Sequence, residues 1–247
     1  MPSRFFVNAF DADDLALAAK LGLGLEIDTY LWPCTDAETA QKQRAVAAMM
    51  RGFPARSFHG TAITRAYETI ARMPIDRLVA LYDASCAQAL FHGVDRIVFH
   101  SDYAAANESP PMWIARNAQI WRRVLAEKPD SFRLYLENFA QDTPQMLAQL
   151  CDLIGDPRFA ICLDTGHAHC NASVPVAEWV EILGARIGHV HLHNNDGLSD
   201  RHWPLGRGTL NLVPVLRALQ TRARAPAFVL ECSLAASLCW LREHHFL

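Results

Sequence analysis

The sequence predicts an α/β protein, a (β/α)8 TIM barrel in which eight parallel strands are enclosed by outer helices. Eight short apolar, β-rich runs occur along the chain, and an amphipathic segment follows each of them. Dividing the 247 residues among eight units gives about 31 residues each, close to the ~30 of a βα repeat. The runs are apolar throughout rather than alternating, as in Ala160–Leu163, which is typical of parallel strands buried on both faces. We therefore expect one barrel domain over residues 1–247.

The eight apolar runs give the predicted strands. They are Arg4–Phe10, Leu23–Tyr30, Arg56–His59, Asp95–His100, Phe132–Asn138, Phe159–Asp164, Ile187–His193 and Ala227–Glu231. A doubly wound open sheet is the alternative, but its first turn is usually rich in glycine, and residues 8–11 read Asn-Ala-Phe-Asp. The closed barrel is therefore favoured.

Helices are predicted between the strands from the spacing of apolar residues. They are Asp11–Leu21, Asp36–Met50, Asp76–Phe91, Met112–Ala126, Thr143–Ile154, Val176–Leu183, Leu212–Thr221 and Ala235–His244. Pro144 and Pro175 stand near helix starts, where the missing N–H is tolerated. Gly93 and Gly155 stand where a helix would end.

Composition argues against several classes of protein. The 23 basic and 26 acidic residues give a net charge of −3, so no excess of positive charge indicates a nucleic-acid partner. No apolar run reaches the ~18–20 residues of a membrane span, and the first residues contain no long apolar signal segment. The seven cysteines are scattered without a CxxC pair, which favours a reducing cytoplasm over a disulfide framework or a cysteine-based zinc site.

Side chains of metal-binding type stand at the ends of six successive predicted strands. They are His59, His100, Glu137, Asp164, His191 and Glu231. In a parallel barrel these ends meet at one rim, where the active sites of this fold lie. Two loops after the sixth and seventh strands, residues 164–167 and 200–202, add His167, Asp200 and His202.

Imidazole and carboxylate groups are the ligands of zinc, manganese and related divalent ions. Several carboxylates in one barrel mouth would repel one another, and a bound cation removes that repulsion. Any one of these residues alone is more often structural, but chance seldom places such residues at six successive strand ends. His189, His191 and His193 share one face of the seventh strand, so spacing alone leaves open which of them binds metal.

Five motifs carry a resemblance to a known family. They are Leu136-Glu137-Asn138, Leu163-Asp164-Thr165-Gly166-His167-Ala168, His191-Leu192-His193-Asn194-Asn195-Asp196, the segment from Asp200 to Gly208, and Val229-Leu230-Glu231. In strand order and spacing over about residues 55–232, the chain resembles the xylose isomerase-like TIM-barrel superfamily. That group includes endonuclease IV (AP endonuclease family 2) and many sugar or sugar-phosphate isomerases and epimerases.

The resemblance implies a primary metal site of Glu137, Asp164, His191 and Glu231, as in the isomerases and epimerases. It points to His191 as the ligand and to His193 as a neighbour that supports the site or faces the substrate. The endonuclease IV branch uses a larger set around a zinc cluster, and residues of the right type stand at all of its matching positions. These are His59, His100, Glu137, Asp164, His167, His191, Asp200, His202 and Glu231. We therefore expect one to three divalent ions, zinc or manganese.

The first functional hypothesis is a metal-dependent sugar or sugar-phosphate isomerase or epimerase. Glu137 and Glu231 would exchange a proton on opposite faces of a substrate whose carbonyl is polarised by the metal. His167 or His193 would hold substrate oxygens. Arg65 and Arg72 in the long segment 60–74 could grip a phosphate, although a solvated role is the commoner one for loop arginines. Trp32, Trp113 and Trp203 could line the mouth, although packing between barrel and helices explains a tryptophan equally well.

The second hypothesis is phosphoester hydrolysis by a two- or three-metal centre, acting on DNA with abasic sites or on a small phosphodiester. The complete ligand set favours it. The segment Gly60-Thr61-Ala62-Ile63 lacks the His-x-Pro-Tyr pattern of endonuclease IV, and no basic stripe accompanies it, which counts against DNA. The third hypothesis is a catalytically silent metal- or sugar-binding barrel. A small-molecule substrate and no membrane partner are expected, and the oligomeric state is open.

Overall fold

The computed structural model describes residues 4–8, 12–31, 36–62, 71–222 and 225–247. The predicted barrel is confirmed: eight parallel strands form a closed ring in the order β1 to β8. The strands are β1 (Phe5–Asn8), β2 (Gly24–Ile27), β3 (Arg56–His59), β4 (Arg96–His100), β5 (Arg133–Glu137), β6 (Phe159–Asp164), β7 (Ile187–Leu192) and β8 (Ala227–Leu230). The ring closes where β1 pairs with β8, with Phe5 opposite Phe228.

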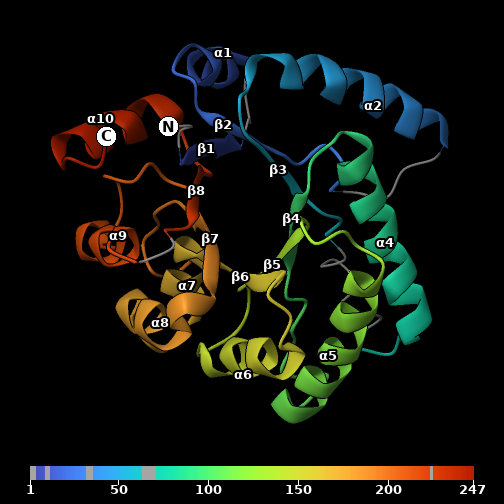
Figure 1. The fold of residues 1–247 in the computed structure, drawn as a ribbon. Coiled ribbons are helices and arrows are strands. Elements are labelled where there is room, and N and C mark those ends of the chain that lie inside the picture. The colour runs from blue at the N-terminus through green and yellow to red at the C-terminus, as the bar shows by residue number, and fades with distance from the viewer. Residues whose placement is uncertain (1–3, 9–11, 32–35, 63–70, 223–224) are drawn as a thin grey trace.

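Helices surround the ring of strands (Figure 1). They are α1 (Ala12–Lys20), α2 (Asp36–Met49), α4 (Ile75–Phe91), α5 (Pro110–Ala126), α6 (Gln145–Ile154), α7 (Thr165–Asn171), α8 (Val176–Leu183), α9 (Leu212–Gln220) and α10 (Leu234–Glu243), with short 3-10 turns at Met50–Gly52 and Gly184–Arg186. Gly155 ends α6 in the left-handed conformation at φ 65°, as predicted. No helix in the described ranges is long and apolar enough to cross a membrane.

The core lies between the strands and the outer helices, as the apolar strands predict. Trp113 and Trp121 of α5 and Trp179 of α8 are among its largest fully buried side chains. The suggestion that Trp113 lines the mouth is therefore wrong, because its ring packs edge-on against Tyr103 at a centroid distance of 5.8 Å and is 0% exposed. Trp32 lies outside the described residues.

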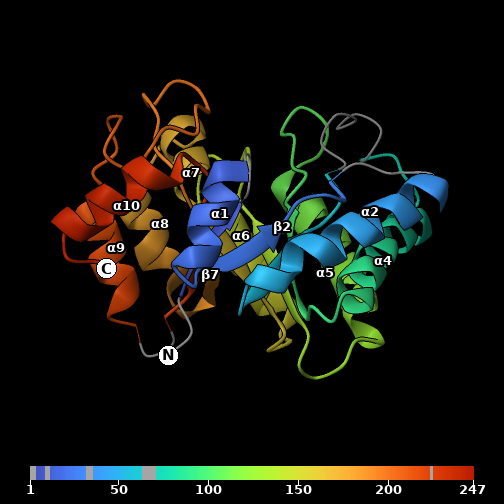
Figure 2. The same cartoon turned by 90° about the horizontal axis from the view of Figure 1, so that it is seen from above.

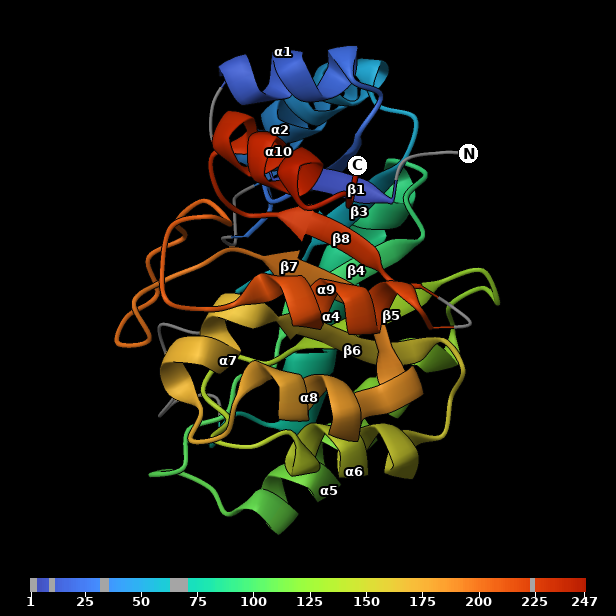
Figure 3. The same ribbon diagram turned by 90° about the vertical axis from the view of Figure 1, so that its left-hand side faces the viewer.

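The loops that follow the strands gather at one end of the barrel. Figures 2 and 3 show the orange segment between β7 and α9 and the green segment between β4 and α5 at this end. One predicted loop is wrong: residues 165–171 form helix α7 directly after β6. Asp164 causes this, because its side chain accepts a hydrogen bond from the His167 backbone N–H at 2.6 Å and caps the new helix.

Candidate metal centre

The barrel mouth brings together all nine residues that the sequence marked as metal ligands. A cavity of about 520 Å³ opens there, and seven of the nine line it. The other two, Asp164 and His191, lie beneath the cavity and are 0% exposed. The register of the strands explains the convergence, because His100 stands opposite Glu137 and Asp164 opposite His191 in neighbouring strands. The mouth therefore forms one cluster of residues of metal-binding type rather than several separate polar positions.

Glu137 lies at the centre of the cluster. Its Oε2 atom is 3.2 Å from His59 Nε2, 3.6 Å from His100 Nε2 and 3.3 Å from His191 Nδ1. Its Oε1 atom is 3.1 Å from His167 Nδ1. A single carboxylate thus contacts four imidazoles from four different elements of the fold.

Three carboxylates converge on Nδ1 of His191, a fully buried residue. Its Nδ1 atom lies 3.3 Å from Glu137 Oε2, 3.4 Å from Glu231 Oε1 and 3.8 Å from Asp164 Oδ2. Asn8 donates from Nδ2 to Glu231 Oε1 at 3.3 Å and so holds the Glu231 carboxylate in place. This is the four-residue group that the resemblance implies as a primary metal site.

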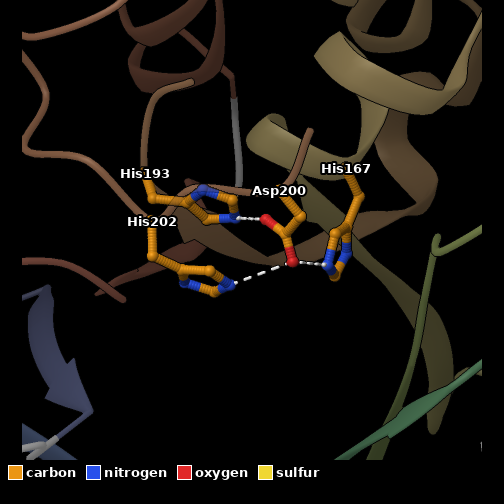
Figure 4. A group of neighbouring side chains, drawn as sticks. All are labelled: His167, His193, Asp200 and His202. Atoms are coloured by element: carbon orange, nitrogen blue, oxygen red, sulfur yellow. Dashed lines mark hydrogen bonds and ion pairs between the residues drawn. The ribbon is translucent and has the colours of Figure 1, made fainter. Parts of the chain in front are cut away.

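A third group lies toward the outer edge of the mouth. Figure 4 shows His167, His193 and His202 turned toward the carboxylate of Asp200. The distances to its oxygens are 3.3 Å from His167 Nε2, 3.2 Å from His202 Nε2 and 3.7 Å from His193 Nε2. His193 is also 3.1 Å from Asp164 Oδ1, so it connects this group to the deeper one.

Backbone carbonyls orient three of the rings. Nδ1 of His59 contacts the carbonyl of Gly60 at 3.1 Å, Nδ1 of His167 that of Asn138 at 3.0 Å, and Nδ1 of His202 that of Glu231 at 2.9 Å. Since a carbonyl can only accept, each Nδ1 carries the proton, which leaves Nε2 facing the carboxylates inside the mouth. Metal-binding histidines are commonly held in this way through the ring nitrogen that faces away from the metal.

Local structure holds the loops that carry these side chains. Asn138 clamps the end of β6, donating from Nδ2 to the Asp164 carbonyl at 2.9 Å and accepting from the Asp164 N–H at 2.8 Å. Asn194 pairs with Trp203 in an isolated antiparallel bridge, which brings His202 back over the mouth with a left-handed φ of 47°. Trp203 itself packs under Arg207, whose guanidinium carbon is 4.6 Å from the ring centroid.

Charge strongly perturbs the groups of the centre. Burial disfavours the charged form of His59, but its contact with Glu137 outweighs this and raises the pKa of His59 to about 9. Burial also opposes the charge on His202, yet Asp200 and Glu231 raise its pKa to about 9. The pKa of His100 shifts in the opposite direction. Burial, together with repulsion from His59 and other neighbouring rings, lowers it to about 3 despite the nearby Glu137.

The residues fit a divalent-metal site on the chemistry of the donors. His191 is buried, and neither ring nitrogen makes a well-aligned hydrogen bond, although carboxylate oxygens surround both. Groups of His and carboxylate atoms that lie within 4.8 Å of one another include His59, Glu137 and His191, and also His167, His193, Asp200 and His202. Cations at these positions would neutralise carboxylates that otherwise share one buried space.

The sequence reasoning missed three polar residues here. Asn8 and Asp28 line the cavity, and Glu26 of β2 is buried directly beneath it. The sequence did contain a signal for Glu26, because this carboxylate stands inside an otherwise apolar strand. A glutamate is almost never fully buried unless it is paired with another polar group. Arg72 is exposed and does not line the cavity, and Arg65 lies outside the described residues.

The chain belongs to the xylose isomerase-like TIM barrel family, whose sequence model matches residues 76–244. A probable endonuclease 4 from Mycobacterium leprae is 28% identical over 154 residues, which cover 58% of this chain and 59% of the relative. The uncharacterized protein MJ1311 from Methanocaldococcus jannaschii is 38% identical over 81 residues, 32% of this chain and 27% of that protein. The matches thus span less than two thirds of either relative.

Solved structures share the whole fold. The TTHB071 protein from Thermus thermophilus, soaked with ZnCl2, superposes with a TM-score of 0.75 at 23% identity over 98% of both chains. A D-tagatose 3-epimerase-like protein superposes with a TM-score of 0.77 at 19% identity, covering 99% of this chain and 97% of that one. At these identities the likeness establishes the barrel architecture.

Proposed function

We propose that this protein is a divalent-metal-dependent phosphoester hydrolase with a multinuclear centre at the barrel mouth. The observation that carries the proposal is the group His167, Asp200 and His202, which stands beside a complete four-residue site around His191. A single ion held by Glu137, Asp164, His191 and Glu231 would leave the other five ligand-type residues without a metal to bind. The geometry thus favours the second of the three hypotheses drawn from the sequence.

The ligands divide into three sets, two of which share Glu137. His59, His100 and Glu137 would hold one ion, the group around His191 a second, and His167, Asp200 and His202 a third. The division is supported by the inward-facing Nε2 atoms of His59, His167 and His202, whose opposite nitrogens contact backbone carbonyls. When bound, such ions supply Lewis acidity for phosphoryl oxygens and activate water.

The chain's own residues define the space for the substrate. Phe139 forms an apolar wall, with its ring 4.8 Å from that of His167 and 5.2 Å from that of His100. Asn8 and Asp28 supply polar atoms on the side of the mouth formed by β1 and β2. Glu231 is positioned by Asn8 and can hold a proton at the edge of the cavity, where it would contact the attacking water or the leaving oxygen.

A small phosphoester fits this mouth better than a DNA duplex. The cavity of about 520 Å³ matches the ~300–1,000 Å³ of small-molecule sites. Among the described residues, no lysine or arginine lines it, and the chain is acidic overall. The endonuclease relatives make the abasic duplex a substrate that must still be tested.

Epimerisation of a sugar is the second candidate, and one contact favours it. Glu137 Oε2 and Glu231 Oε1 both approach His191 Nδ1, at 3.3 and 3.4 Å, from strands that are not neighbours in the barrel. Two carboxylates placed in this way could exchange a proton across a bound sugar. His167 and His193 would then contact substrate oxygens instead of serving the outer group.

Metal counting tests the two candidates together. Purified protein loaded with zinc or manganese should hold at least two ions per chain by elemental analysis. His202→Ala should lose about one ion and most hydrolysis of an aryl phosphodiester, because it opens the outer site. His169→Ala is the matched control: His169 lies on the same short helix as His167 but contacts Thr209, so metal content and activity should persist.

The number of bound ions and the substrate that is turned over distinguish the hydrolase from the epimerase. A single ion per chain in the wild type would overturn the multinuclear centre, and turnover of a ketose panel would then establish the epimerase. Two or more ions with cleavage of the abasic duplex but not of the small ester would replace the proposed substrate by DNA.

A further inference from the structure

Beneath the proposed metal centre lies a polar group that the hydrolytic function does not use. Glu26 of β2 is 1% exposed and does not line the cavity. Its carboxylate reaches across the barrel interior to His191 and His189 of β7 and sideways to Ser57 of β3. The separations are 2.8 Å from Oε1 to His191 Nε2, 2.9 Å from Oε2 to His189 Nε2, and 2.8 Å from Oε2 to Ser57 Oγ.

The two oxygens of Glu26 have different partners. Ser57 and His189 both donate to Oε2, whereas Oε1 lies 2.8 Å from His191 Nε2. Glu26 also offers one oxygen that lies within 4.8 Å of ligand atoms of His191 and Glu231. The contact with His191 is short but bent, because Oε1 lies off the direction of the ring N–H. The carboxylate is therefore fixed by two hydrogen bonds on one oxygen and presents the other to the ring above it.

His191 is also oriented differently from the other candidate ligands. His59, His167 and His202 turn Nδ1 toward a backbone carbonyl and Nε2 into the mouth. His191 does the reverse, with Nδ1 among the three carboxylates of the centre and Nε2 directed down at Glu26. At this ring, a buried carboxylate takes the place that a backbone carbonyl has at His59, His167 and His202, whereas Nδ1 of His100 has no hydrogen-bond partner among the described residues.

We infer that Glu26 is a positioning residue that sets the orientation and tautomer of His191. By keeping the proton on Nε2, Glu26 leaves the Nδ1 lone pair free for the ion held with Glu137, Asp164 and Glu231. The inference rests on the proposed metal centre and concerns only its deepest ion.

A layer of rings supports this arrangement from below. Tyr135 of β5 stacks on His189 with centroids 5.0 Å apart and planes at 26°. Gly188 makes room for the tyrosine, because a Cβ atom there would come within 2.7 Å of Tyr135 Cε1. His189 is thus held in place to donate to Glu26, which accounts for a third histidine on the inner face of β7.

Glu26→Gln tests the inference because it keeps the size of the side chain and removes its charge. Competition with a chelator should show the tightest-bound zinc weakened about 10- to 100-fold, the usual effect of losing such a partner. Ser57→Ala is the matched control: it removes a donor to the same carboxylate without touching His191, and zinc affinity should change less than about threefold. Thermal unfolding of the metal-free proteins separates the loss of zinc affinity from a loss of stability. A variant that is merely less stable would have a lower melting temperature without a selective loss of zinc affinity.

A measurement on the wild type makes the inference independent of any variant. In zinc-loaded protein with 15N-labelled histidine, NMR should find His191 bound to metal through Nδ1 and protonated at Nε2. A ring bound through Nε2, or Glu26→Gln protein with undiminished zinc affinity, would overturn the inference while the metal centre stands. Wild-type protein that binds no divalent ion would overturn the metal centre itself, and the inference with it.

Discussion

Metal binding should release protons, and acidification should therefore weaken it steeply. In the metal-free protein, neighbouring carboxylates outweigh burial and raise the pKa values of His59 and His202 to about 9 and the pKa of His167 above its usual range. Cys162, with the surrounding carboxylates, raises the pKa of His191. At these values, His59 and His202 carry an extra proton at neutral pH. A divalent ion can bind only where that proton has left, so each occupied ligand adds to the pH dependence.

The size of the effect can be worked out for His59, which is 4% exposed. Its pKa of about 9 lies two units above pH 7. Removing its proton at pH 7 therefore costs about 2.7 kcal/mol, at ~1.36 kcal/mol per unit, which weakens binding about 100-fold. His202, with a pKa also raised to about 9, adds a second proton of the same kind. His100 adds none, because its pKa is lowered to about 3 and the ring is already neutral.

Isothermal titration calorimetry measures this proton count when zinc binding is repeated in buffers of different ionisation enthalpy. His59 and His100 form a matched pair, since their rings lie 4.8 Å apart and both face Glu137. His59→Asn should release about one proton fewer than the wild type, while His100→Asn should release the same number. Affinity that stays constant between pH 9 and pH 7, or equal proton release from the two variants, would refute the electrostatic reasoning.

Three further predictions follow from the same geometry. Glu137 raises the folded-state pKa of His59 from the ordinary 6.5 to about 9, so their contact should stabilise the metal-free protein. The stabilisation should be complete below about pH 6.5 and should be lost as the pH rises through about 9. Melting temperatures measured across this pH range would show the loss. Gly166→Ala should destabilise the fold by about 1–3 kcal/mol in denaturant titrations, because the added Cβ would lie 1.9 Å from Cε1 of His193. Among the described cysteines, Cys239 is exposed and should react first with a thiol reagent, whereas rapid reaction of the buried thiols would indicate a loosened core.

The barrel and its rim were predictable because both depend on periodic features of the sequence. The strand at Phe159–Asp164 was predicted with its observed bounds, since it is apolar and ends at a carboxylate. Residue types at successive strand ends then located the mouth, because parallel strands bring those ends together. Helix α7 was not predicted, because seven residues are too few to show a helical period and its start depends on the side-chain cap of Asp164.

Glu26 escaped prediction for a different physical reason. Its partners are residues 57, 189 and 191, which are distant from it in sequence. They meet Glu26 only because the barrel pairs β2 with β3 and places β7 across the interior from β2. No local spacing records such a contact. The motif resemblance also begins at about residue 55, so it gave no information on β2.

The number of metal ions could not be predicted from ligand types because Glu137 belongs to more than one group. With only Oε2 engaged, Glu137 would complete a one-metal site with His191. The same oxygen also faces His59 and His100, while Oε1 faces His167, and these contacts join the sites into one centre. Isomerase and hydrolase sites therefore share most of their ligands, and the difference lies in whether the additional histidines converge on this carboxylate. Here they do, and on this ground we propose the multinuclear hydrolase over the isomerase that the sequence analysis placed first.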